Sequence, residues 1–294
     1  MKWNDVKLTN QPIEHAVNCA INALHYEVSL SPKPGLVDPQ SNGAHTDMNV
    51  FTFISSITSL APFFIQYIHA GFYHQQSYIS LFEELREIGK QAESAMMTAT
   101  KGINTHKGAN FSFAILLGAT GCYYQQTTVK TWTKSDTDQL FNIAAALCRH
   151  LVECDLQGLN VQDELSYGQK NYLTYGLTGI RGEAVAGYPT VQKLLNYLRR
   201  LPDEGNIKLL RGLVYLMSET EDSNLVHRGG YEAMKEVQCE MKKIHEANLP
   251  KSDLLHVLTA YDQVLIDRHL SPGGSADLLA LAIYFLQLEG FTFW

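Results

Sequence analysis

The sequence lacks the cysteine patterns that stabilise small secreted domains or bind zinc. Its five cysteines, at positions 19, 122, 148, 154 and 239, are odd in number and include no Cys-x-x-Cys pair. A disulfide framework and a zinc ribbon are therefore excluded. The first residues, Met-Lys-Trp-Asn-Asp-Val-Lys, also lack the apolar stretch of a secretory signal. We expect a cytoplasmic protein whose thiols are reduced.

Several motifs of nucleotide-binding and hydrolytic enzymes are missing as well. Neither Gly-x-x-x-x-Gly-Lys-Ser/Thr nor Gly-x-Gly-x-x-Gly after a strand occurs, so a P-loop and a dinucleotide-binding fold are excluded. The sequence has no His-Glu-x-x-His, no Gly-x-Ser-x-Gly and no His-Asp dipeptide, which argues against zinc proteases, serine hydrolases and helical phosphohydrolases. Carboxylates remain the expected metal ligands, and oxygen ligands suit magnesium.

Charged residues are also sparse, at 18% of the chain, and acids outnumber bases to give a net charge of −7. This balance argues against a general binder of nucleic acid or of an anionic membrane, because either would need a basic face. An anionic ligand therefore requires a local site. With 45% apolar residues the chain can bury a substantial core, and no boundary divides it, so residues 1–294 are predicted to form a single domain.

One long stretch has no charge at all. Met48 to Phe82 contains 35 residues without Lys, Arg, Asp or Glu, which is long enough to suggest a membrane-spanning helix. Several serines, Pro62 and His69 dilute its hydrophobicity, and no basic cluster flanks it. We interpret it as a buried core helix. The uncharged runs Gly108–Val129 and Leu278–Gln287 likewise indicate helices enclosed by neighbours.

Apolar residues recur at helical spacing through most of the chain, whereas alternating strand patterns with hairpin dipeptides are scarce. We therefore predict an all-α globular bundle of about ten helices connected by long functional loops. The helices predicted outside the uncharged runs include residues 11–28, 77–98, 136–152, 190–200, 203–217, 231–247, 251–266 and 275–289.

Five polar loops between these helices each combine a Gly or Pro turn with basic residues, and four of them also contain acids. They are residues 31–47, 102–110, 176–183, 219–230 and 267–277. Loops at one end of a bundle can converge, and charges between buried helices are costly unless they are paired or bind a ligand. The run 102–110 opens an apolar helix, whose unpaired N–H groups suit an anion such as phosphate. For each acid, a helix cap or a surface ion pair is the alternative.

The loop motifs are similar to those of the triphosphoribosyl-dephospho-CoA synthase family, which acts in prosthetic-group synthesis for citrate lyase. One departure is Asp222-Ser-Asn, where the family has Asp-Thr-Asn. The hydroxyl is kept. The resemblance rests on the blocks Ser31-Pro-Lys-Pro-Gly-Leu-Val-Asp38, Gly43-Ala-His-Thr-Asp-Met48, Gly102-Ile-Asn-Thr-His-Lys-Gly-Ala109, Arg181-Gly-Glu-Ala184, Asp222-Ser-Asn-Leu-Val-His-Arg-Gly-Gly230 and Leu270-Ser-Pro-Gly-Gly-Ser-Ala-Asp-Leu-Leu279.

The resemblance implies transfer of the 5-triphosphoribosyl group of ATP to the ribose 2′-hydroxyl of 3′-dephospho-CoA, with release of adenine. This chemistry requires neutralisation of a polyphosphate, a base for the attacking hydroxyl, and protonation or hydrogen bonding of the departing adenine. Residue type and loop position then suggest roles. We expect catalytic roles for Glu183, Asp277 and His106, although a structural role for His106 is the alternative. Either Glu183 or Asp277 would be the base, and His106 would assist the leaving adenine.

The remaining loop residues are candidates for binding the nucleotide and a metal ion. Magnesium is the expected cofactor, with Asp38, Asp47 and Asp222 as candidate ligands. The candidates for binding ATP and its phosphates are Lys33, Asn104, Lys107, Gly108, Arg181, Arg228, Ser271, Gly273 and Gly274.

The expected partners are the substrates ATP and 3′-dephospho-CoA, and a separate transferase that passes the product to the acyl carrier subunit of the lyase. We expect no nucleic acid and no membrane partner, and a homo-oligomer is left open. Three alternatives remain: the same reaction serving malonate decarboxylase, a non-catalytic helical nucleotide-binding protein, and a helical interaction protein.

Overall fold

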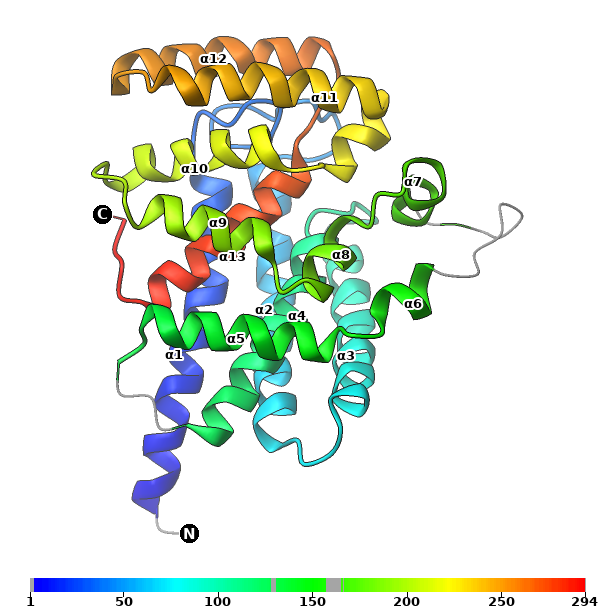
Figure 1. The fold of residues 1–294 in the computed structure, drawn as a ribbon, viewed down its shortest axis with the longest axis vertical. Coiled ribbons are helices and arrows are strands. Elements are labelled where there is room, and N and C mark those ends of the chain that lie inside the picture. The colour runs from blue at the N-terminus through cyan, green and yellow to red at the C-terminus, as the bar shows by residue number, and fades with distance from the viewer. Residues whose placement is uncertain (1–2, 128–130, 157–164, 166, 294) are drawn as a thin grey trace.

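The protein is all-α in the computed structural model, which describes residues 3–127, 131–156, 165 and 167–293 (Figure 1). No strand occurs among these residues, so the predicted fold class is confirmed. Thirteen helices are present where about ten were predicted. They are α1 (Trp3–Ser29), α2 (Val50–Tyr73), α3 (Tyr78–Ala99), α4 (Lys107–Gln126), α5 (Lys134–Leu147), α6 (Leu151–Leu156), α7 (Tyr167–Tyr175), α8 (Gly179–Val185), α9 (Pro189–Leu198), α10 (Gly205–Glu219), α11 (Ser223–Ala247), α12 (Lys251–Asp267) and α13 (Gly273–Leu288).

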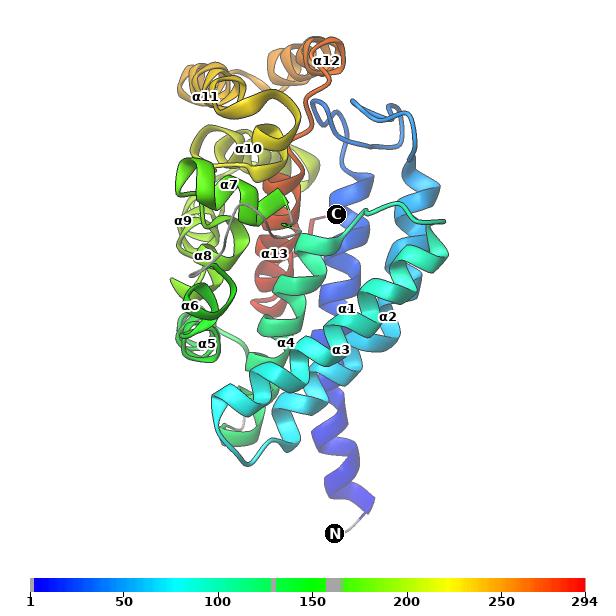
Figure 2. The same cartoon turned by 90° about the vertical axis from the view of Figure 1, so that its right-hand side faces the viewer.

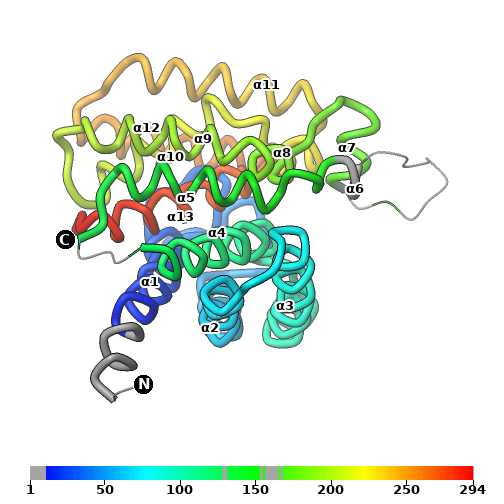
Figure 3. The backbone as a smooth tube through the Cα atoms, turned by 60° about the horizontal axis from the view of Figure 1, so that its bottom comes forward, coloured from blue at the N-terminus to red at the C-terminus, as the bar shows by residue number. Residues whose placement is uncertain are grey.

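Helices α4 and α13 form the centre of the bundle. Figures 2 and 3 show them between α1–α3 on one side and α5, α9 and α10 on the other, with α11 and α12 across one end. Most residues of both central helices are buried, as the uncharged runs Gly108–Val129 and Leu278–Gln287, which overlap them, predicted. The buried apolar side chains of the described residues form one cluster. The division of the chain into domains stays a prediction.

Glycines fix the position of α4 against α2. A Cβ on Gly71 would lie 1.9 Å from the carbonyl oxygen of Gly118, and one on Gly121 would lie 2.1 Å from that of Ile68. The two backbones therefore approach more closely than any larger residue allows. This contact fixes the second half of α4 against α2.

The uncharged helix α2 is buried on one face only. Ile57, Leu60 and Phe64 pack inward, where α2 contacts α1, α3 and α4. Phe51 and Tyr73 on its outer face are 72% and 67% exposed, so the prediction of a buried core helix holds for half of its surface. By length and composition α2 could cross a membrane, and no other helix of the described chain passes that test.

Four of the five predicted loops are partly helical, and helix extends furthest into 219–230 and 176–183. The segment 219–230 was expected to be a loop, but α11 begins at Ser223 because the Asp222 carboxylate caps its first turn. Gly230, with φ of +84°, then kinks α11 where the predicted helix at 231 starts. The glycine-rich segment 176–183 contains the short α8.

The four cysteines whose side chains the structure describes are free thiols, as expected. The side chain of Cys154 and residues 157–164 and 166 lie outside the described part of the chain.

Candidate active site

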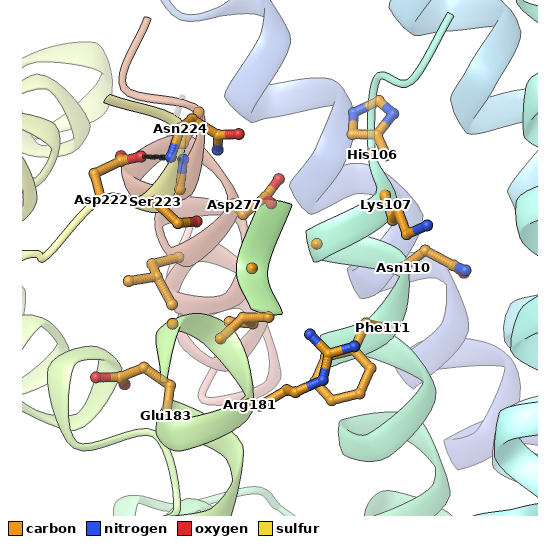
Figure 4. Close-up of a pocket in the computed structure, with 18 of the residues that line it drawn as sticks. His106, Lys107, Asn110, Phe111, Arg181, Glu183, Asp222, Ser223, Asn224 and Asp277 are labelled. Carbon is orange, nitrogen blue, oxygen red and sulfur yellow. Dashed lines mark hydrogen bonds between the residues drawn. The ribbon is translucent and has the colours of Figure 1, made fainter. Parts of the chain in front are cut away.

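A cavity of about 1390 Å³ opens where the N-terminal ends of α4, α11 and α13 meet. Its lining comes from all five predicted polar loops, and it includes thirteen of the fifteen residues proposed as site residues. Asp38 and Asp47 are the two that do not line it. Figure 4 shows His106 and Lys107 on the α4 side, Asp222 and Asn224 on the α11 side, and Asp277 between them. The loops thus converge, whereas the three candidate metal ligands do not.

Asp222 joins the N-terminal ends of two helices. One carboxylate oxygen accepts from the backbone N–H groups of Asn224 at 2.9 Å, Leu225 at 3.4 Å and Gly274 at 3.2 Å. The other accepts from the N–H and the hydroxyl of Ser275, at 2.8 and 3.0 Å. Burial raises the pKa of Asp222, although these hydrogen bonds favour the ionised form. With five donors around it, the carboxylate acts mainly as a cap for α11 and α13.

Asp277 lies against the first turn of α4. A Cβ on Gly108 would lie 2.2 Å from Oδ2 of Asp277, so only glycine fits there while the carboxyl keeps its place. The carboxyl also accepts a hydrogen bond from the N–H of Ala109. Burial, together with the charges of Glu27 and Asp222, raises the pKa of Asp277 well above its usual value. This shift favours the protonated carboxyl, which is the form that can donate a proton into the cavity.

A buried ion pair between Glu27 of α1 and Lys33 forms part of the wall. The Lys33 backbone N–H donates to Asp38, whose other carboxylate oxygen accepts from Gln40 and Ser41 at 2.7 and 2.9 Å. These bonds hold the proline-rich loop in one shape. Asp38 is therefore buried inside its own loop and turned away from the cavity, which explains why it does not lie beside Asp222.

Asp47 and Arg228 lie in the region around His45. The Asp47 side chain is 58% exposed and 3.7 Å from His45 Nδ1. The Arg228 guanidinium donates to the carbonyls of Ala44 and His269, at 2.9 and 3.3 Å, and to Nδ1 of His45 at 3.0 Å. His45 Nε2 bonds the Ser271 hydroxyl at 2.9 Å. Arg228 thus joins the loop 31–47 to the turn before α13.

The cations on the α3, α4 and α8 side are held by acids. Arg86 and Arg181 both donate to Asp155, at 3.1 and 3.0 Å. The exposed Lys107 ammonium lies 2.5 Å from Glu93, and its backbone N–H is capped by Asn104 Oδ1 at 3.2 Å. An anionic ligand that reaches these cations competes with the carboxylates already paired to them.

His106 and Glu183 differ in their surroundings. Burial and the nearby charges of Lys33 and His25 lower the pKa of His106 to about 3, so its imidazole is neutral at physiological pH. It can form hydrogen bonds to adenine but cannot protonate it as an imidazolium. Glu183 accepts from the N–H and hydroxyl of Thr190, at 3.2 and 2.6 Å, and burial raises its pKa.

Comparison with known proteins identifies the family. A family model described as ATP:dephospho-CoA triphosphoribosyl transferase matches residues 13–292. The chain belongs to this family. The resemblance found in the loop motifs is thereby confirmed, and so is the prediction that the protein is an enzyme, a pentosyltransferase. No solved structure matches the chain.

Two streptococcal relatives show how complete this match is. A protein of Streptococcus equi subsp. zooepidemicus (strain H70), named probable 2-(5''-triphosphoribosyl)-3'-dephosphocoenzyme-A synthase, is 48% identical over 292 residues, covering 96% of this chain and 99% of the relative. A protein of Streptococcus pyogenes serotype M5 (strain Manfredo) with the same name is 48% identical over 279 residues, 92% of this chain and 95% of the relative.

Several cavity residues escaped the sequence analysis because they lie within helices. Glu27 ends an apolar helical stretch, and Arg86 is one of several charges on α3. Neither residue gave a signal in the sequence, because the partner of each becomes apparent only in the folded protein. Glu27 pairs with Lys33, and Arg86 pairs with Asp155 of α6.

Proposed function

We propose that the protein transfers the 5-triphosphoribosyl group of ATP to the ribose 2′-hydroxyl of 3′-dephospho-CoA and releases adenine. The observation that carries the proposal is the cavity: thirteen candidate residues, drawn from motifs spread over the matched chain, line one space. A cavity of about 1390 Å³ also exceeds the roughly 300–1,000 Å³ typical of sites for one small ligand. It supports binding of both substrates at the same time.

The charge of the lining supports magnesium as the cofactor. Eight Lys and Arg side chains and eight Asp and Glu side chains line the cavity, so the protein alone offers a triphosphate little net positive charge. The described residues contain no cluster of three His, Cys, Asp or Glu. This fits an ion held chiefly by substrate phosphates and water, with few protein ligands. Asp222 is the predicted ligand that lines the cavity, but both of its oxygens already accept hydrogen bonds, so magnesium would be held mainly by the triphosphate and water and would neutralise the triphosphate there.

Asp277 is proposed as the acid that protonates the leaving adenine. The glycosidic bond between C1′ of ATP and the adenine nitrogen breaks, its electron pair goes to adenine, and a new bond joins C1′ to the acceptor oxygen. A proton leaves the attacking hydroxyl and another reaches adenine. The raised pKa of Asp277 supports a role in protonating adenine rather than in removing the proton of the attacking hydroxyl. Glu183 remains the candidate base, because burial raises its pKa and so makes its carboxylate a stronger proton acceptor.

Chromatography and mass spectrometry of a reaction mixture test the function. Purified protein incubated with ATP, magnesium and 3′-dephospho-CoA should yield adenine and a heavier CoA species in equal amounts. Omission of either substrate should abolish both products, and chelation of magnesium should slow their formation. Binding of ATP without adenine release would support the alternative of a non-catalytic nucleotide-binding protein.

The metabolic role proposed for the product is that of precursor to the citrate lyase prosthetic group. A separate transferase would attach it to the acyl carrier subunit, and we place these steps in the cytoplasm. The same product would serve malonate decarboxylase, and the genes adjacent to this one distinguish the two roles. Genes for citrate lyase subunits beside it would support the first.

A further inference from the structure

The wall of the cavity contains a buried hydrogen-bond chain that ends at His106. Ser56 of α2 is fully buried, and its hydroxyl oxygen lies 2.7 Å from His106 Nδ1. The Thr105 hydroxyl, one residue before His106, donates to the same Ser56 oxygen at 2.7 Å. The chain Thr105–Ser56–His106 therefore joins α2 to the residue just before α4.

The direction of these bonds determines the tautomer of His106. A hydroxyl group has one proton to donate and can accept from a second donor. Because Ser56 accepts from Thr105, its own proton is available for Nδ1 of His106. A neutral imidazole that accepts at Nδ1 carries its proton on Nε2. The ring is therefore a hydrogen-bond donor at Nε2.

That donor has no hydrogen-bond partner among the residues that the structure describes. His106 is only 2% exposed, and Nε2 is among the buried polar atoms without a hydrogen bond. Phe53 holds the ring by an edge contact, with ring centroids 4.9 Å apart, and the His106 backbone N–H contacts the Met96 sulfur at 3.4 Å. A buried donor left without an acceptor destabilises the free protein, and a ligand acceptor would satisfy it.

We propose that Thr105 and Ser56 fix His106 as the Nε2-protonated tautomer, and that this N–H donates to an acceptor atom of the bound nucleotide. The inference rests on the proposed function for the identity of the ligand. The acceptor is a ring nitrogen of adenine or an oxygen of the triphosphate, and both are unprotonated acceptors. His106 is then a neutral binding residue, and Ser56 and Thr105 are positioning residues.

Substitution of His106 by an amide side chain tests whether activity depends on a neutral hydrogen-bond donor at this position. In His106→Gln the side-chain amide can place an N–H near the position of Nε2, whereas His106→Ala removes the donor. We expect His106→Ala to lower kcat/KM for ATP about tenfold or more, and His106→Gln to recover most of that loss, as expected for one buried hydrogen bond. Equal losses in the two variants would overturn the proposal, because proton transfer by the imidazole cannot be replaced by an amide.

Nitrogen-15 NMR of the histidine rings reads the tautomer directly, without any substrate. The His106 signals, assigned by their absence in His106→Gln, should show a protonated Nε2 and an unprotonated Nδ1, unchanged between pH 5 and 8. In Ser56→Ala the two tautomers should mix, and Ser56→Thr should restore the original signals. Ser59→Ala is the matched control, since its hydroxyl donates to the carbonyl of Ser56 on the same helix. A proton on Nδ1 in the unmodified protein would contradict the proposal.

Calorimetry with the two halves of the nucleotide identifies the acceptor. Adenine and inorganic triphosphate are titrated separately into the unmodified protein and into His106→Ala. Weaker binding of either compound in the variant supports the donor role and names its partner, and unchanged binding of both overturns it. A protein that shows the expected tautomer but releases no adenine would refute the transferase reaction alone.

Discussion

Replacing Gly108 by Ala tests whether the position of Asp277 matters for catalysis. The added Cβ would lie 2.2 Å from Oδ2 of Asp277, so the carboxyl must move by about 1 Å or more to restore an ordinary contact. Gly108 has an ordinary helical backbone in the first turn of α4, and Ala favours a helix over Gly by up to about 1 kcal/mol. The free energy of unfolding should therefore change by less than about 1 kcal/mol.

Activity should respond much more strongly than stability. A misplacement of about 1 Å at a reacting group can lower the rate on the order of 100-fold. The assay is the initial rate of adenine release, measured together with urea unfolding of the same preparation. Gly212→Ala is the control, because Gly212 lies within helix α10 outside the cavity lining and its added Cβ would meet only leucine side chains, at 3.1 Å or more. A folded Gly108→Ala variant with full activity would refute the role of Asp277.

Three other substitutions test the remaining parts of the site. Asp277→Asn should reduce adenine release by about 100-fold or more. Because the pKa of Asp277 is raised in the folded protein, ionisation of this residue in the unfolded chain makes folding less favourable as pH rises above about 4. Asp277→Asn removes this effect, so its stability relative to the unmodified protein should rise with pH above about 4, and an equal pH dependence in the two proteins would contradict the shift. Asp222→Ala leaves two helix starts uncapped and should lower the free energy of unfolding by about 2–4 kcal/mol in urea titrations, and a loss under about 1 kcal/mol would refute the capping role. Lys107→Ala should raise the Kd of ATP in calorimetry, whereas unchanged affinity in a folded variant would exclude Lys107 from phosphate binding.

Helical periodicity was enough to predict the fold class. The segments 11–28 and 251–266, which have apolar residues at helical spacing, lie in α1 and α12. The uncharged runs 108–129 and 278–287 lie largely in the buried helices α4 and α13. The short helices α6, α7 and α8 were missed, because segments of six, nine and seven residues are too short to show a clear helical periodicity. Helix α11 begins at Ser223 and not at the predicted residue 231, because Asp222 caps its first turn. The Asp222 carboxylate is itself held by hydrogen bonds to α13, which the sequence does not reveal.

The sequence predicted those residues of the candidate site that lie in loops with recognisable Gly and Pro turns. Glycine and proline turns marked the segments that carry Lys33, Lys107 and Asp277, and all three line the cavity. The sequence could not predict which carboxylate oxygens of a loop face the cavity. Their orientation depends on which backbone N–H groups of the loop they accept hydrogen bonds from. Asp38 resembled a metal ligand in sequence, yet its carboxylate accepts three backbone hydrogen bonds from its own loop.

Residues inside helices were harder to recognise. Glu27 and Ser56 belong to amphipathic or apolar helices and carry no local signal of function. Their importance appears only when α1 and α2 are packed against the start of α4. The neutral state of His106 is equally a property of the folded protein, since burial lowers its pKa to about 3.

The mass of the CoA product is the measurement that tests the central claim most directly. Purified protein, magnesium, 3′-dephospho-CoA and ATP labelled with carbon-13 in the ribose should give one adduct that contains the labelled ribose and all three phosphates, with one adenine released per adduct. Unaltered 3′-dephospho-CoA, or an adduct that carries phosphate without the labelled ribose, would contradict triphosphoribosyl transfer in this cavity.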